Sequence, residues 1–161
     1  MSLRDQSRNE YKRAMKSLSC ARSALNSAMF RRVADIVDRI VSLAPDQDNA
    51  HASVSGDTVY IFVNLTSIDG LKDPRLENIL AMLDGENHYN VATFDYPTMM
   101  NRDYTYRYVA GEGVLIVKVS AYFKEDSETC KRVIVGYTQP KEPEPIYKLT
   151  CNGDAGEVVN V

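Results

Sequence analysis

The residues best suited to chemistry lie in one segment near the middle of the chain. The segment runs Asp95-Tyr96-Pro97-Thr98-Met99-Met100-Asn101-Arg102-Asp103-Tyr104. Its carboxylates suit a hard cation, with Asp69 or Asp73 as further ligands. The spacing does not match the calcium-binding loop D-x-D-x-D-G. Asn and Asp are also typical turn residues that bond their own backbone. Three interpretations therefore stay open: a structural loop, a contact with a partner, and a catalytic site.

The partner-contact interpretation gains support from the two methionines, because flexible thioethers suit adaptable binding surfaces. It assigns six residues to one surface: Asp95, Met99, Met100, Asn101, Arg102 and Asp103.

Two patterns indicate possible nucleic-acid contacts. Five basic residues near the N-terminus could contact phosphates, although a solvated helix face has the same pattern; they are Arg4, Arg8, Lys12, Arg13 and Lys16. Tyr104, Tyr106 and Tyr108 alternate along one predicted strand, flanked by Arg102 and Arg107. Such tyrosines could stack bases, or they could form ordinary cross-strand pairs.

Motifs for known catalytic and cofactor chemistry do not occur in the sequence. The two histidines, His51 and His88, have no H-x-H, H-x-x-x-H or H-E-x-x-H spacing. The three cysteines show no C-x-x-C pair, and no glycine-rich phosphate loop or nucleophile motif is present. We therefore predict no catalytic residue, cofactor or metal, and we favour a non-enzymatic protein. An enzyme whose site converges only in the folded chain remains an alternative.

The N-terminal part of the chain predicts a long amphipathic helix. Apolar residues recur at steps of three and four from Tyr11 to Ile40, and Ala44-Pro45-Asp46 ends the pattern near Leu43. One long helix is the main prediction, and a break into two helices near residues 17–27, where serines are frequent, is the alternative. A continuous helix would be roughly 50 Å long and would project from a small domain. We therefore expect a homo-oligomer that forms through this helix.

The next part predicts two strands and a short helix. Ser55-Gly56-Asp57 suggests a turn between strands at 50–54 and 58–66. The second strand is apolar on both faces, which is typical of a central strand with something packed on each side. Asp73 and Pro74 then predict a helix start, with Gly85 as its end.

The remainder predicts an antiparallel meander. Its expected strands cover residues 88–94, 103–110, 114–123, 129–137 and 146–151, with a loop or bulge at 95–101. The last two strands, paired across residues 138–145, place Cys130 opposite Cys151. These cysteines could form a disulfide if oxidised, whereas in the cytosol we expect a reduced apolar pair. The predicted fold is α+β, with a long N-terminal helix, one short helix and an antiparallel sheet of about six strands.

Length, charge and hydropathy complete the prediction. The 161 residues fit one domain, divided into a basic helical arm at 1–43, an α+β body at 44–152 and a flexible tail at 153–161. The arm has a net charge of +5 and the rest of the chain −8. No apolar run is long enough for a membrane span, and the N-terminus lacks the apolar core of a signal peptide. The expected location is the cytoplasm, without membrane contact.

About two thirds of the chain resembles small accessory proteins of tailed bacteriophages. The resemblance is carried by Asp73-Pro74-Arg75-Leu76, Asn101-Arg102-Asp103-Tyr104 and Val133-Ile134-Val135-Gly136-Tyr137. It implies action in the host cytoplasm or a minor place in the virion, and it assigns no residue a role.

The sequence thus favours a non-enzymatic interaction protein that self-associates and binds another protein. One concrete version is an inhibitor whose acidic body occupies the basic groove of a host factor. A nucleic-acid-binding protein that uses the basic N-terminal helix is the first alternative.

Overall fold

The computed structural model describes residues 3–66, 68–70, 72–83, 89–95, 99–124, 130–137 and 145–151. Three helices are described: α1 (Leu3–Leu25), α2 (Ala28–Val41) and α3 (Pro74–Leu83). Seven strands are described: β1 (Asn49–Ser55), β2 (Thr58–Leu65), β3 (Tyr89–Asp95), β4 (Met99–Ala110), β5 (Gly113–Lys124), β6 (Cys130–Tyr137) and β7 (Pro145–Cys151). The predicted α+β class is confirmed. The tail at 153–161, His88 and the helix end at Gly85 lie outside the described residues.

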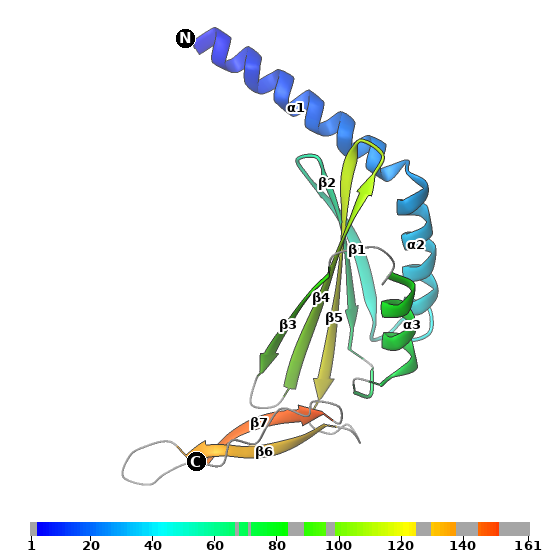
Figure 1. The fold of residues 1–161 in the computed structure, drawn as a ribbon, viewed down its shortest axis with the longest axis vertical. Coiled ribbons are helices and arrows are strands. Elements are labelled where there is room, and N and C mark those ends of the chain that lie inside the picture. The colour runs from blue at the N-terminus through cyan, green and yellow to red at the C-terminus, as the bar shows by residue number, and fades with distance from the viewer. Residues whose placement is uncertain are drawn as a thin grey trace.

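The strands form one mixed sheet and one separate ribbon. Five strands have the order β1-β2-β5-β4-β3, and β6 and β7 form a separate pair among the described strands. β2 and β5 run parallel, whereas the other pairs are antiparallel. The expectation of an all-antiparallel sheet of six strands was therefore wrong in detail. Helices α2 and α3 cover one face of the sheet, and α1 crosses one end of it (Figure 1).

The N-terminal region forms two helices and not the one long helix that was the main prediction; the break falls within the serine-rich stretch that offered the alternative. Ser27 caps α2, because its hydroxyl accepts a hydrogen bond from the Phe30 N–H at 3.0 Å. The same hydroxyl donates to the Ala24 carbonyl at 2.6 Å, which ties the end of α1 to the start of α2. The chain therefore turns between the two helices, and only α1 projects from the body (Figure 1).

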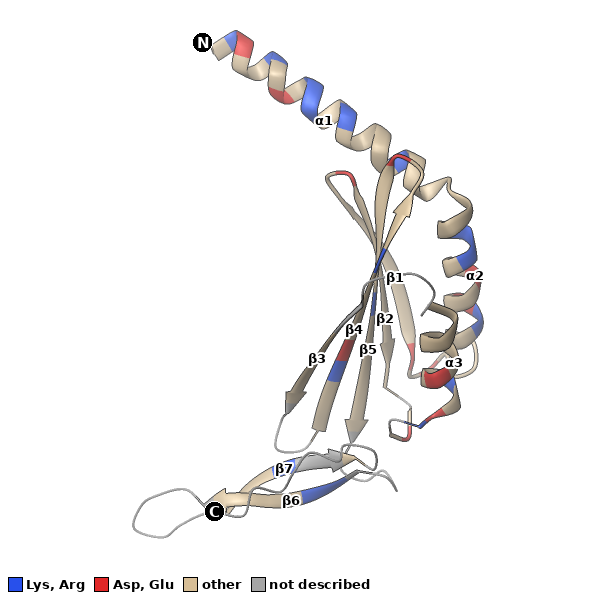
Figure 2. Ribbon diagram, viewed as in Figure 1, with Lys and Arg blue, Asp and Glu red and all other residues tan. Residues whose placement is uncertain are grey.

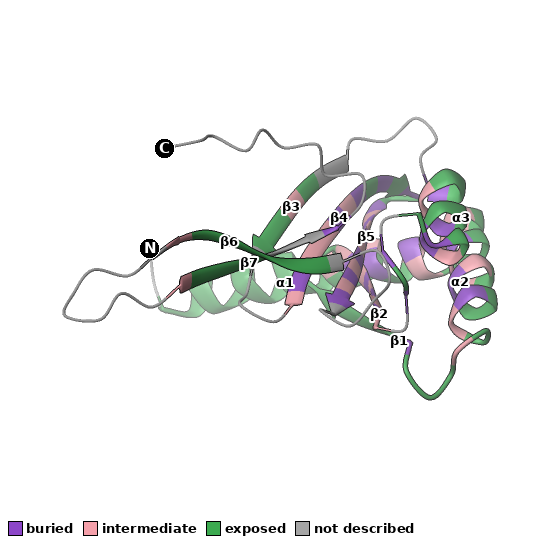
Figure 3. Cartoon of the chain, turned by 90° about the horizontal axis from the view of Figure 1, so that it is seen from below, coloured by how far each residue is buried: buried purple, intermediate pink, exposed green. Residues whose placement is uncertain are grey.

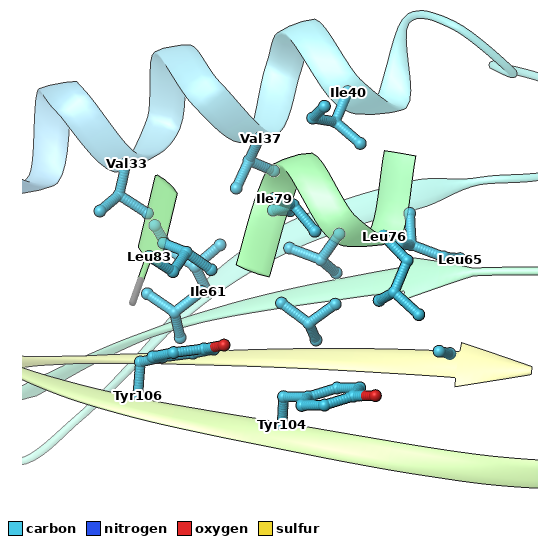
Figure 4. Close-up of a cluster of buried hydrophobic side chains, with 14 of the residues drawn as sticks. Val33, Val37, Ile40, Ile61, Leu65, Leu76, Ile79, Leu83, Tyr104 and Tyr106 are labelled. Atoms are coloured by element: carbon cyan, nitrogen blue, oxygen red, sulfur yellow. The ribbon is translucent and has the colours of Figure 1, made fainter. Parts of the chain in front are cut away.

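The core lies between the sheet and the two covering helices. Val33 and Val37 of α2 and Ile79 of α3 point into it (Figure 4). Tyr104 and Tyr106 are buried there too, and the Tyr108 hydroxyl donates to the Leu83 carbonyl at 2.7 Å. The proposal that these tyrosines stack bases was therefore wrong. Burial is concentrated on this side of the sheet, while the ribbon and β1 are largely exposed (Figure 3).

The C-terminal end of α1 rests on the turn between β4 and β5. Ala21 and Ala24 are buried, and such small side chains permit close approach. The Ser23 hydroxyl accepts a hydrogen bond from the Glu112 N–H at 3.0 Å. A Cβ atom at Gly113 would collide with the Cys20 carbonyl oxygen, so glycine is required for this contact. The base of α1 is thus anchored, which fixes the direction in which the rest projects.

Candidate functional site

The first candidate surface is the free part of α1. Every residue from 3 to 16 is exposed. Four large apolar side chains of α1 are exposed: Leu3 (84%), Tyr11 (66%), Met15 (49%) and Leu18 (61%). Such a helix segment gains nothing from the core of its own chain, and a short isolated helix is only marginally stable in water. These residues are therefore candidates for contact with another molecule.

The five predicted phosphate-contacting residues lie on this same arm. Arg4, Arg8, Lys12, Arg13 and Lys16 are all exposed. Figure 2 shows the basic positions along the length of α1. Arg13 forms an ion pair with Glu10 at 2.9 Å. Both side chains are more than two thirds exposed, so this pair contributes little to the stability of the helix. The exposed part of α1 therefore carries both positive charges and apolar side chains.

The six residues predicted as one partner surface do not form one. Asp95 belongs to β3 and residues 99–101 belong to β4, so the loop or bulge expected over 95–101 was wrong for these residues, and residues 96–98 lie outside the described ones. Alternation along the strand places Met100 and Arg102 on the core face, and Asn101 and Asp103 on the other. Met100 is 1% exposed, which excludes it as a surface residue. Met99 is half-buried, and the Asp95 side chain lies outside the described residues.

A buried ion network at the start of α3 was missed at the sequence level. The Arg75 guanidinium contacts Asp48 Oδ2 and Asp73 Oδ2, each at 3.1 Å. Asp48 Oδ1 also accepts from the Thr66 N–H at 2.8 Å. Asp73 caps α3 as predicted, because its Oδ1 accepts from the Arg75 N–H at 2.9 Å. The network joins the loop before β1 to the end of β2 and to α3.

This network makes Asp73 a structural residue. Burial alone would raise the pKa of the Asp73 carboxyl, but hydrogen bonds from the Arg75 side chain and from the Asp69 and Arg75 backbone lower that pKa overall. The hydrogen bond to Asp73 in turn raises the pKa of Arg75. The idea that Asp73 helps to bind a hard cation therefore loses its support. Within the described ranges, no group of three or more His, Cys, Asp or Glu residues could hold a metal ion.

The second candidate surface is the sheet face opposite the core, which we call the open face. Tyr60 and Phe62 of β2 lie on it, with ring centroids 5.9 Å apart and planes within 14°. His51 of the neighbouring strand stacks on Phe62 at 4.9 Å. The Lys118 ammonium of β5 lies 5.9 Å from the Phe62 centroid. Among the described elements, no helix covers this face (Figure 1).

The open face is locally cationic. Strand register places Arg107 beside Ile116, and Ile116 beside Tyr60, so Arg107 belongs to the same face as the aromatic rings. Arg107 is exposed, whereas Asp103, the acidic residue described on this face, is half-buried. The apolar pattern on both sides of β2 predicted a central strand with a cover on each face; β2 is central, but the described helices cover one face alone (Figure 1).

The third candidate surface is the β6–β7 ribbon. Val133, Ile134, Val135 and Ile146 are exposed, and the Arg132 guanidinium lies 4.9 Å from the Tyr147 ring centroid. The predicted register is confirmed, because Cys130 is the partner of Cys151. Cys151 is buried and disulfide-bonded. Of the two alternatives that the sequence left open, reduced thiols and a disulfide, the structure has the disulfide at Cys151.

Comparisons with protein-family models, with curated proteins and with solved structures found no significant match. In the part of the chain that is described, no helix is long and apolar enough to cross a membrane. Function must therefore be inferred from the three surfaces themselves.

Proposed function

We propose that this chain is a non-enzymatic interaction protein that self-associates through α1 and binds another protein. The observation that carries the proposal is the row of exposed apolar side chains on a projecting helix. Tyr11, Met15 and Leu18 are spaced by four and then three residues, which places them on one side of the helix. That spacing matches the seam of two paired helices. A second copy of α1 would cover the row and stabilise both helices.

The partner protein is proposed from charge and resemblance. Exposed acids such as Asp57 and Glu112 lie in the turns at one end of the sheet, and residues 44–161 carry a net charge of −8. An acidic surface is complementary to a basic nucleic-acid groove. The resemblance to phage accessory proteins would make such a partner a host factor in the cytoplasm. In that compartment the disulfide at Cys151 would have to persist against reducing thiols.

Self-association predicts that polar substitutions on the row convert an oligomer into a monomer. We expect the variant Tyr11→Ser, Met15→Ser, Leu18→Ser to weaken association by about 100-fold or more, because three apolar side chains lose their burial. Sedimentation equilibrium of the full chain measures this change. Deleting the whole N-terminal region is unsuitable, because Val33 and Val37 belong to the core.

The matched control is Leu43→Ser, which removes an apolar side chain that is 64% exposed but lies outside α1. Its molar mass should equal that of the unmodified chain. A full-length chain that sediments as a monomer, or a triple variant that keeps the oligomer mass, would contradict the proposal.

A second candidate function, nucleic-acid binding by the arm, is supported by the exposure of all five basic residues. If they contact the phosphates of duplex DNA, the variant Arg8→Gln, Lys12→Gln, Lys16→Gln should lower the slope of log K against log salt by about 2 to 3. Arg39→Gln, at an exposed basic position on α2, is the control. Fluorescence anisotropy over a salt series measures the slope. An unchanged slope in the triple variant would exclude this function.

A further inference from the structure

We propose that the open face of the sheet binds single-stranded nucleic acid. In this arrangement a base extends the ring stack of Tyr60, Phe62 and His51, while Lys118 and Arg107 contact phosphates. This site is separate from the α1 row and from the basic arm, and it does not depend on either of them.

The ring geometry supports stacking. The planes of Phe62 and Tyr60 differ by 14°, and those of Phe62 and His51 by 15°, so the three rings lie nearly parallel. His51 is exposed on the edge strand β1, while the other two rings are half-buried. A flat base can therefore add to the stack at its exposed end without repacking the core. Stacking on aromatic side chains is the usual way in which sheets hold unpaired bases.

The local charge supports a polyanion as the ligand. Lys118 lies within reach of the stack, and Arg107 extends the cationic surface along β4. Asp103 is the described acid on this face and is half-buried, whereas Asp57 and Glu112 lie in turns at the strand ends, so the exposed charge described beside the rings is positive. An uncharged aromatic ligand would not require the two cations. A duplex would not suit the stack, because its bases are already paired and stacked.

The direction of α1 also fits this ligand. Figures 1 and 3 agree that α1 projects on the side of the sheet away from α2 and α3, which is the side of the open face. A strand bound to the open face would therefore leave the sheet toward a second set of basic residues. This second contact would add affinity without being needed for stacking.

The test is fluorescence anisotropy with labelled oligothymidine and oligouridine of about 12 nucleotides, a length typical of single-strand sites. We expect both to bind, and a tighter oligouridine complex would identify RNA as the source. His51→Ala and Phe62→Leu should each weaken binding by about 10-fold, because they remove part of the stack. Lys118→Gln should lower the slope of log K against log salt by about 0.7.

The control is Tyr147→Leu, which removes an aromatic ring that also lies beneath a cation but on the β6–β7 ribbon. It should bind like the unmodified chain. His51→Ala keeps the test informative if Phe62→Leu does not fold, since His51 is exposed. Three results would overturn the proposal: no binding of either oligonucleotide, equal affinities for the open-face variants and the control, or losses confined to the arm variants. Unchanged sedimentation of the open-face variants would show that self-association is a separate property.

Discussion

Replacing Arg75 by leucine is expected to lower the free energy of unfolding by about 3–5 kcal/mol. The substitution leaves two carboxylates without their cation, and their side chains are 0 and 9% exposed in the network. Removing one partner of a buried ion network typically has this cost, because the remaining charge stays desolvated. Urea unfolding at pH 7, followed by circular dichroism, measures the change.

The same variant should respond to pH in a defined direction. In the unmodified chain the lowered pKa of Asp73 stabilises the fold above the ordinary carboxyl pKa of about 4, and this stabilisation is lost as the pH falls through the lowered value. Arg75→Leu removes the hydrogen bonds and the charge of the Arg75 side chain, which lower the pKa of Asp73 in the unmodified chain. The stability difference between the two proteins should therefore shrink as the pH falls below about 4.

The matched control is Arg13→Leu, which breaks an ion pair with side chains 78 and 71% exposed. It should change stability by less than about 1 kcal/mol. Two results would show that the ion network does not cause the loss of stability. One is an equal loss of unfolding free energy in Arg13→Leu and Arg75→Leu; the other is a stability difference between Arg75→Leu and the unmodified chain that does not change with pH.

Reduction of the Cys151 disulfide is expected to unfold the β6–β7 ribbon while the main sheet stays intact. A disulfide that closes a loop of about 20 residues contributes about 3 kcal/mol. A two-stranded ribbon alone is marginally stable, and within the described part of the chain β6 and β7 pair with no other strand. Hydrogen exchange should therefore lose protection at residues 131–135 on reduction, while β5 remains protected.

The half-buried free thiol Cys20 provides the control for this experiment. Cys20→Ser should respond to the reductant as the unmodified chain does, and Cys151→Ser should resemble the reduced chain without any reductant. Equal loss of protection in β5 and β6 would mean that the ribbon and the sheet unfold together.

Local elements were predictable because their signals lie within a few residues. Asp73 and Pro74 fixed the start of α3, and Ser55-Gly56-Asp57 fixed the β1–β2 turn. The opposition of Cys130 and Cys151 followed from the length of one connection. The parallel pairing of β2 with β5 could not be predicted in this way. The apolar pattern of β2 indicated a central strand, but it does not identify a neighbour that is distant in sequence.

The candidate surfaces were predictable only in part, because burial depends on which face of a strand meets the core. Asn101 and Asp103 share a segment with Met100, yet strand alternation places Met100 on the core face and the other two residues on the open face. Tyr104 and Tyr60 have the same chemistry, and only the packing of α2 and α3 decides which of them is buried. The basic residues of α1 were easier to predict, since charged side chains on a helix segment that no described element covers stay exposed.

The central parallel pair has a consequence for synthesis. The β1–β2 hairpin is complete once Leu65 has been made, but its second neighbour, β5, ends only at Lys124. Until then β2 presents an unpaired edge and a run of apolar residues, Val59-Tyr60-Ile61-Phe62-Val63, with high strand propensity and no charge. Such segments promote aggregation while they are exposed. The interval between the synthesis of β2 and that of β5 is therefore the stage at which the growing chain is most exposed to aggregation through this strand.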